Sequence, residues 1–137
     1  MTVGNVLVYK SNSLYDKNMQ EFEFKLPKKL NTQNFYGLPY TERDKIALEW
    51  AIIISKALDK GKVEHLPCAP PTALTFDFYL RGEPLSANDC GAMVDIIIKA
   101  LLQRKVFRSD SSVAISQITI IPNKSKRQSS YCVVELD

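Results

Sequence analysis

The stretch TALTFDFYLRGEPLSANDCGAMVDIIIKALLQR, residues 72–104, changes its hydrophobic period once, and this change indicates the fold class. From 72 to 80, apolar side chains at the even-numbered positions alternate with Thr75, Asp77 and Tyr79, which predicts a strand. Beyond residue 88 the apolar side chains recur every three to four residues, which predicts a helix capped by Ser86 or Asn88. A strand followed by an apolar helix is typical of a sheet that has helices packed on it.

The remaining segments extend this architecture. Further strands are predicted over 5–9, 21–27, 112–121 and 131–136, and a further helix over 42–58 with Thr41 as its cap. The side chains of that helix expected to face the core are those of Ile46, Trp50, Ile53, Ile54 and Leu58. The order β-β-α-β-α-β-β predicts an α+β fold, with two main helices packed on a mixed sheet. Segment 28–40, rich in Asn and aromatic residues, is predicted to be a structured loop.

Composition and length predict one domain over residues 1–137, in which residues 1–20 can add an N-terminal strand and loop. The chain is 45% hydrophobic and has no run of apolar residues long enough for a membrane span, so we expect a cytoplasmic protein. Its cysteines, Cys68, Cys90 and Cys132, lack the spacing of a zinc site and are expected to be reduced. The net charge of +3 is too small to indicate a nucleic-acid partner by itself.

Motifs for several kinds of catalysis are absent from the sequence. It has no Gly-rich phosphate loop, CxxC pair, HExxH or GxSxG motif, and its one histidine, His65, lies in a Pro-rich connector. Catalysis by a nucleophile and a histidine base is therefore disfavoured.

Three carboxylates bracket the second predicted helix and allow two interpretations. Taken singly, Asp89 suits a helix N-terminus, Asp95 can pair with Lys99 one turn later, and Asp110 suits a turn. Taken together, the three aspartates can form a Mg²⁺ site if the segment after the helix folds back beside it. Such a site would hold the ion through hard oxygen ligands and activate water.

This segment resembles the RusA-like crossover-junction endodeoxyribonucleases, small phage and prophage resolvases. Their signature, D-x-D-N-x-x-K followed by an apolar helix and an Asp-Asp turn, aligns with residues 89–113 without a gap, and Asp89 and Asp110 match two of the acids. LPKKLNTQNFY (26–36) and IIPNKSKRQSSYCVVEL (120–136) are similar to the family's loop before its first helix and to its closing hairpin. The chain departs from the signature at Gly91, Ala92 and Asp95, which replace Asp, Asn and Lys.

The resemblance implies a homodimeric, Mg²⁺-dependent endonuclease that resolves Holliday junctions or other branched DNA in recombination and repair, in the host cytoplasm if a phage encodes it. Its catalytic and metal-binding residues would be Asp89, Asp95 and Asp110, where Asp95 replaces the acid lost at Gly91 from the same helix face. The residues expected to contact phosphates around these acids are Lys28, Lys29, Arg104, Lys105, Arg108, Lys124, Lys126 and Arg127. The altered motif leaves open an inactive RusA-fold module that binds DNA or a protein partner.

Overall fold

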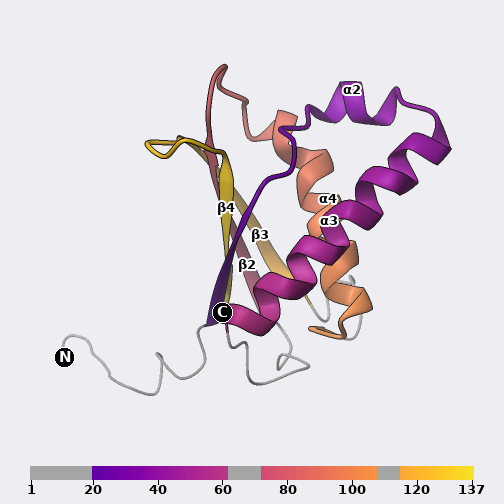
Figure 1. The fold of residues 1–137 in the computed structure, drawn as a ribbon. Helices are drawn as coiled ribbons and strands as arrows, with labels where there is room; N and C mark the ends of the chain where they lie inside the picture. The colour runs from indigo at the N-terminus through magenta and orange to yellow at the C-terminus, as the bar shows by residue number, and fades with distance from the viewer. Residues whose placement is uncertain (1–19, 62–71, 108–114) are drawn as a thin grey trace.

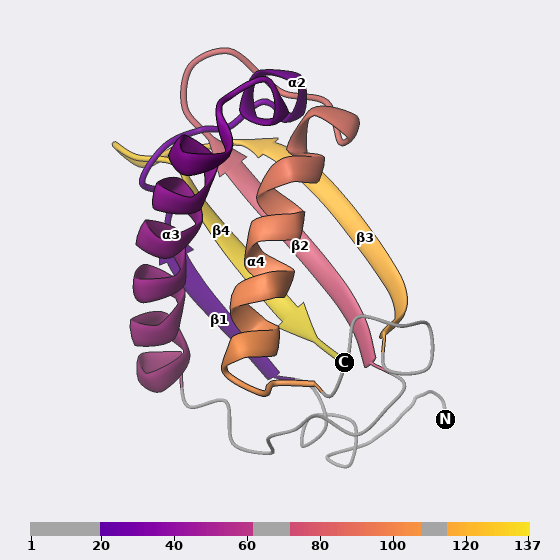
Figure 2. The ribbon, with the colours of Figure 1, turned by 90° about the vertical axis from the view of Figure 1, so that its right-hand side faces the viewer.

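The computed structural model describes residues 20–61, 72–107 and 115–137, and its strands form one mixed sheet with helices on one face (Figures 1 and 2). The strands are β1 (Gln20–Lys25), β2 (Thr72–Leu80), β3 (Ile115–Lys124) and β4 (Tyr131–Leu136), in the order β1-β4-β2-β3. Strand β4 runs antiparallel to both β1 and β2, whereas β2 and β3 are parallel. Parallel neighbours need a crossover connection, and a helix between β2 and β3 provides it.

The two long helices, α3 (Tyr40–Gly61) and α4 (Gly91–Gln103), cover the same face of the sheet (Figure 2). A short helix, α2 (Thr32–Tyr36), precedes α3, and a 3-10 turn, η1 (Asn88–Cys90), leads into α4. Helix α4 packs against the sheet, α3 and α2, and only a narrow stripe that includes Asp95 and Lys99 remains exposed. This placement explains why the sequence of α4 is apolar around most of its circumference.

The core lies between the sheet and the helices. Alternate residues of β2, namely Leu74, Phe76, Phe78 and Leu80, are buried, and Trp50 of α3 is 0% exposed. Burying one such side chain stabilises the fold by roughly 1.5–3 kcal/mol. The alternation that predicted the strand therefore also supplies the energy that holds the helices to the sheet.

The structure confirms the α+β class and most predicted elements. Strands 72–80 and 131–136 have the predicted bounds, and the predicted stripe of α3 is buried or partly buried. Two predictions are wrong at the level of local structure. Segment 28–40 contains helix α2, because the Asn31 side chain accepts hydrogen bonds from Gln33 N and Asn34 N, and α3 begins at Tyr40, so Thr41 lies inside it.

Several predictions concern residues outside the described ranges: the strand 5–9, His65, Cys68, Arg108 and Asp110. The strand predicted over 112–121 is described from Ile115, and β3 continues to Lys124. None of the described helices combines the length and apolarity that crossing a membrane requires.

Candidate nucleic-acid interface

Three separate segments of the chain meet at the end of the sheet where β2 finishes. Ser125 N, after β3, donates to Leu80 O at 2.9 Å, and Leu26 N, after β1, donates to Ser130 O at 3.0 Å. Arg81 N donates to the hydroxyl of Ser130 at 2.9 Å. These bonds hold together the loop after β1, the turn after β2 and the β3–β4 loop, although they are far apart in the sequence. Strand β2 lies between β3 and β4 in the sheet, so this loop is not the closing hairpin that the resemblance implies.

This meeting point gathers basic side chains, which we call the basic end: Lys28, Lys29, Arg81, Lys124, Lys126 and Arg127. All except Lys29 are exposed. Within the described residues, Lys28, Lys124 and Lys126 make no ion pair or side-chain hydrogen bond, so their ammonium groups are available to a partner. Unpaired lysines gathered on one surface are what contact with a phosphate backbone requires.

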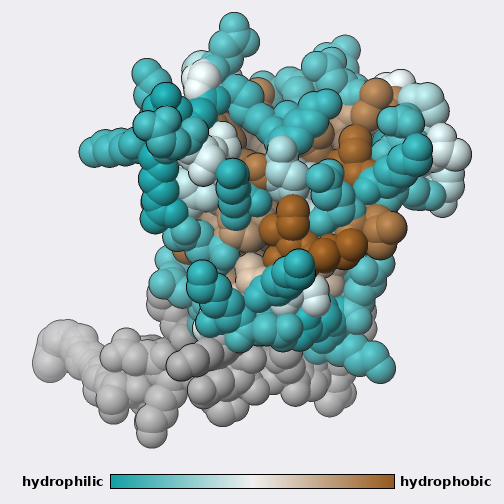
Figure 3. Space-filling model, in the orientation of Figure 1, coloured by the Kyte–Doolittle hydropathy of each residue, from teal (hydrophilic) through white to brown (hydrophobic). Residues whose placement is uncertain are grey.

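The β3–β4 loop, which carries Lys126 and follows Lys124, is held by a buried serine at its start. The Ser125 hydroxyl donates to Ser129 O at 2.8 Å and accepts from Arg127 N at 3.1 Å. The β3–β4 loop projects from the sheet in Figure 1, and hydrophilic side chains cover this region in Figure 3. Because the turn is hydrogen-bonded internally, its lysines are presented on an ordered support.

Arg127 differs from the two lysines, because it already has partners. Its guanidinium donates to the Glu23 carboxylate at 2.5 Å and lies 3.8 Å from the centre of the Tyr131 ring. Tyr131 in turn stacks on Tyr79, with ring centres 4.6 Å apart. Arg127 therefore fixes the β3–β4 loop to the open face of the sheet, and the Glu23 carboxylate partly neutralises the charge of its guanidinium.

Acidic side chains lie on the open face of the sheet, which is the face that the helices do not cover, away from the β3–β4 loop. Glu135 pairs in register with Glu21, and Asp77 lies on neighbouring β2. Burial, followed by the negative charges of Asp77 and Glu21, raises the pKa of Glu135. These carboxylates would repel a polyanion, so this part of the open face is a less favourable surface for DNA than the basic end.

Asp89, the first candidate acid, is hydrogen-bonded to Ser86 at the entry to η1. Asp89 N donates to the Ser86 hydroxyl at 3.2 Å, and the Asp89 carboxylate accepts from Ser86 N at 3.4 Å. This reciprocal pair has the form of a capping box, but it lies at the entry to η1. The N-cap of α4 is Cys90, which makes no side-chain cap bond, so the prediction that Ser86 or Asn88 caps this helix is wrong. Asp89 follows the turn after β2 and therefore lies at the same end of the sheet as the basic residues.

Asp95, the second candidate acid, is bonded to a tyrosine of α2. The Tyr36 hydroxyl donates to Asp95 Oδ2 at 2.5 Å, and within the described residues no ion pair joins Asp95 to Lys99. Burial, then this hydrogen bond and the charge of Asp95, raise the pKa of Tyr36 to about 12. Helical spacing predicted Lys99 as the partner of Asp95, because such spacing relates residues of a single helix. The observed partner, Tyr36, lies on a different helix, α2.

Helix α2 also covers position 91, where the RusA-like signature has its second acid. The Thr32 hydroxyl accepts from Ala92 N at 3.0 Å and can donate to Asp89 O at 3.0 Å. A Cβ added at Gly91 would lie 3.3 Å from Thr32 Oγ1, which is a tight contact, and Ala92 is 0% exposed. The face of α4 that carries positions 91 and 95 is thus occupied by Thr32 and Tyr36.

Of the three candidate acids, the structure describes Asp89 and Asp95. Asp89 and Asp95 have different partners, and in the described part of the chain no three His, Cys, Asp or Glu side chains are close enough to hold a metal ion. Asp110 lies outside the described residues. The chain leaves α4 and enters β3 at Ile115, which pairs with Thr72 at the start of β2, whereas Asp89 follows the end of β2.

The basic residues after α4 lie at the opposite end of this helix. Helix α4 is about 20 Å long at about 1.5 Å per residue. There Arg104 donates to Asp59 Oδ1 at 2.7 Å, to Ser55 O at 3.0 Å and to the Ser55 hydroxyl. Lys105 is exposed and has a φ of 59°, where the chain turns out of the helix. The structure therefore separates Arg104 and Lys105 from the basic end.

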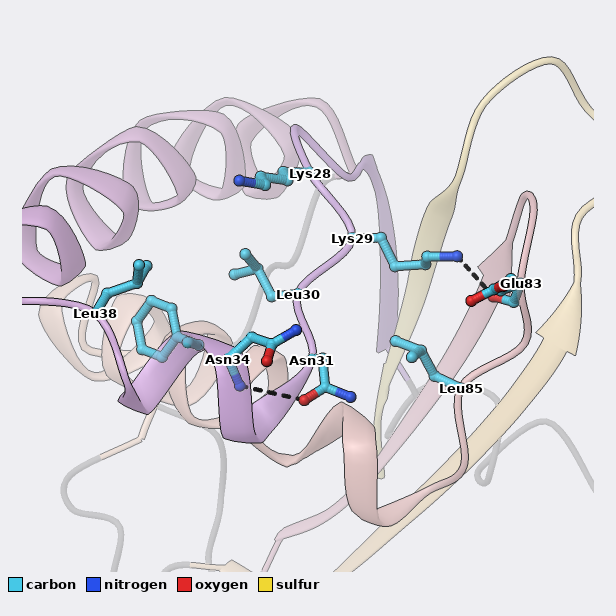
Figure 4. Close-up of a pocket in the computed structure, with 9 residues that line it drawn as sticks. Lys28, Lys29, Leu30, Asn31, Asn34, Leu38, Glu83 and Leu85 are labelled. Carbon is cyan, nitrogen blue, oxygen red and sulfur yellow. Dashed lines mark hydrogen bonds between the residues drawn. The ribbon is translucent and has the colours of Figure 1, made fainter.

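A pocket of about 360 Å³ adjoins the basic end (Figure 4). It is lined by Lys28, Lys29, Leu30, Asn31, Asn34, Phe35, Leu38, Glu83 and Leu85. Lys29 ties the two walls together, because its Nζ donates to Arg81 O at 3.1 Å and to Glu83 O at 2.6 Å. The segment LPKKLNTQNFY thus forms a pocket wall in addition to supplying two lysines.

The two described cysteines, Cys90 and Cys132, are free and buried, as the spacing predicted. Burial raises the pKa of the Cys90 thiol to about 11, and it also raises that of Cys132. Both thiols are therefore protonated and inert at neutral pH.

Sequence reasoning missed three contributors to this region: Arg81, Thr32 and the Tyr79–Tyr131 stack. Arg81 carried a usable signal, since a basic residue directly after a buried strand lies at the sheet end. The roles of Thr32 and of the tyrosine stack depend on contacts across 60 and 52 positions of the chain, which no local pattern reports.

Comparison with known proteins adds no relative: no family model, no curated protein and no solved structure matches this chain.

Proposed function

We propose that this chain is a RusA-like domain that binds branched DNA with its basic end and does not cleave it. The observation that carries the proposal is the gathering of unpaired lysines, Lys28, Lys124 and Lys126, at one end of a sheet whose open face is acidic. Each lysine that neutralises a phosphate releases counterions, which supplies affinity without base specificity. A homodimer would suit a four-way junction, because a twofold protein presents two equivalent surfaces to equivalent strands.

The absence of cleavage in this proposal is supported by the surroundings of α4. Thr32 occupies the space beside Gly91, and the Tyr36 hydroxyl is bonded to Asp95. A hydrolytic Mg²⁺ ion needs several oxygen ligands directed at one point. Position 91, where the RusA-like signature would supply one such ligand, lies against Thr32, and Asp95, the proposed replacement, accepts a hydrogen bond from Tyr36.

The binding proposal is tested by replacing Lys124 and Lys126 at the β3–β4 loop. We expect Lys124→Ala with Lys126→Ala to weaken binding to a synthetic four-way junction, and to lower the slope of log K against log salt by about two. The matched control is Lys56→Ala with Lys60→Ala, which removes the same charge from exposed positions of α3. Fluorescence anisotropy over a salt series measures both quantities, and equal losses in the two double variants would contradict a localised interface.

A second candidate is the Mg²⁺-dependent endonuclease itself, with Asp89, Asp95 and Asp110 as ligands. It is favoured by the position of Asp89 at the basic end, where, among the residues that the structure describes, its carboxylate accepts only a long bond of 3.4 Å from Ser86 N. Incubating the junction with the wild-type chain and Mg²⁺ distinguishes the candidates, because the binding proposal expects no cut strands. Cleavage that disappears in Asp89→Asn and Asp110→Asn would establish the endonuclease and refute the inactive module.

A further inference from the structure

The pocket beside the basic end has an apolar floor. Leu30 and Phe35 are buried, with exposed fractions of 4% and 6%, and Leu38 and Leu85 are partly buried beside them. An apolar floor that includes an aromatic ring offers contact area to a flat, weakly polar group. A simple inorganic anion would gain nothing from these side chains.

The rim of the pocket carries hydrogen-bonding groups with spare capacity. Asn31 uses its side-chain oxygen to cap α2, which leaves its amide N–H groups free to donate. The Asn34 side-chain amide has no hydrogen-bond partner within the described residues, and Asn34 lies beside Asn31 in Figure 4. A side-chain amide places a donor and an acceptor in one plane, and this arrangement can bind the edge of a nucleobase.

Lys28 contributes an unpaired positive charge to the lining of the pocket, and in this respect it differs from Lys29, the next residue in the chain. Lys29 is bonded to two backbone carbonyl groups, whereas Lys28 makes no ion pair or side-chain hydrogen bond within the described residues. The pocket volume of about 360 Å³ is enough for one nucleotide, and is at the lower end of the roughly 300–1,000 Å³ of ligand pockets.

We infer that this pocket binds a single unpaired nucleotide, with the base on Leu30 and Phe35, its edge on Asn34 and its phosphate on Lys28. The inference rests on the proposed function and deepens it, because branched DNA offers unpaired nucleotides, and Lys124 and Lys126 supply the contacts to its backbone. A paired base presents neither face, so the pocket would discriminate against continuous duplex.

The test uses the full chain and two small probes, dAMP and inorganic phosphate, followed through backbone amide signals in NMR spectra. We expect dAMP to shift the signals of the pocket residues, above all Asn31, Asn34 and Leu85, and phosphate to leave them in place. Asn34→Asp keeps the size of the side chain but places a negative charge in the pocket, and we expect it to weaken dAMP binding about tenfold or more.

The control for that variant is Gln33→Glu, which adds the same charge one residue earlier on α2, at an exposed position that does not line the pocket. Both charges lie in the first turn of α2 and suit the helix dipole, so neither variant should unfold the chain. The control should change dAMP binding by no more than about twofold, because an exposed charge is screened by salt. Equal effects of the two variants, or identical shifts with phosphate, would overturn the nucleotide site.

The same experiment separates failure of this inference from failure of the proposed function. If dAMP does not bind while the junction binds through Lys124 and Lys126, the pocket inference falls and the DNA interface stands. If dAMP binds at the pocket while the junction does not bind, the proposed function falls and the pocket remains a site for free nucleotides.

Discussion

The two ends of α4 are attached to the rest of the protein by different chemistry. At the N-terminal end, the Thr32 hydroxyl and the Ser86–Asp89 pair satisfy backbone groups of η1 and α4. At the C-terminal end, the guanidinium of Arg104 bonds to Ser55 and Asp59 on α3. A cation therefore holds the C-terminal end of α4, whereas hydroxyl groups and the Asp89 carboxylate hold its N-terminal end. Near the N-terminal end, Lys28, Lys124 and Lys126 make no ion pair or side-chain hydrogen bond within the described residues.

This contrast indicates how the sequence should be interpreted for function. A basic residue marks a binding surface only where the fold leaves its charge without a partner. By that criterion Lys28, Lys124 and Lys126 qualify, whereas Arg104, which sequence reasoning placed in the same group, has structural partners. The following substitutions test the contrast, from the largest expected effect to the smallest.

Thr32→Val should be the most destabilising of these changes. It keeps the shape of the side chain but leaves Ala92 N without its acceptor at a partly buried position. We expect the free energy of unfolding to fall by about 1–3 kcal/mol, the cost of an unsatisfied buried donor. Urea denaturation measures this loss, and Thr41→Val, at an exposed position of α3, is the control that should change little. Equal stability of the two variants would mean that the hydroxyl does not hold the helix end.

Arg104→Met should cost less, about 1 kcal/mol, because its ion pair with Asp59 is largely exposed and only the bonds to Ser55 are partly buried. Junction affinity should stay unchanged if the two ends of α4 differ as described. The control is Lys105→Met, which removes the same charge without breaking a described hydrogen bond, and should leave stability unaltered. A loss of junction affinity in Arg104→Met alone would extend the DNA interface to this end.

Tyr36→Phe should have the smallest effect on stability at neutral pH, about 0.5 kcal/mol or less, because Tyr36 is 46% exposed. Its signature is the pH dependence. The pKa of Tyr36 is raised to about 12 in the folded chain from 10.0, so folding favours the protonated phenol. This contribution is complete below about pH 10 and is lost as pH rises toward 12.

An absorbance titration of the phenol groups checks this assignment. The wild-type chain should show a tyrosine ionisation toward pH 12 that is missing in Tyr36→Phe. Burial, followed by the charge of Asp77, also raises the pKa of Tyr79, and that step should remain in both chains. Tyr40→Phe is the control, because Tyr40 is 70% exposed and its hydroxyl has no hydrogen-bond partner within the described residues. Loss of the late step in the control instead would reassign it.

Much of the fold could be predicted because its signals are local. Alternation over 72–80 and the apolar, β-branched composition of 131–136 located both strands, and helical spacing after residue 88 located α4. Helix α2 escaped prediction because it is only one turn long, and its formation depends on the Asn31 cap more than on an apolar stripe. Its importance arises from Thr32 and Tyr36, whose partners follow 60 and 59 residues later.

The candidate site was less predictable than the fold. Lys28, Lys124 and Lys126 were identified as members of basic clusters in the sequence. Their convergence with Arg81 depends on bonds between the loop after β1, the end of β2 and the β3–β4 loop. The pairing of Asp95 with Tyr36 instead of Lys99 shows the same limit. A helical spacing shows which side chains can meet on one helix, and it cannot report a competing partner from another segment.

The amino-acid sequence alone determined the class of fold, the central strands and the buried character of α4, because hydrophobic periodicity acts over a few residues. Tertiary structure alone decided which cations stay unpaired, which acids acquire partners and where a pocket opens. Those outcomes depend on contacts between segments far apart in the chain, where the energies of hydrogen bonds and ion pairs are set by neighbours that no local pattern contains.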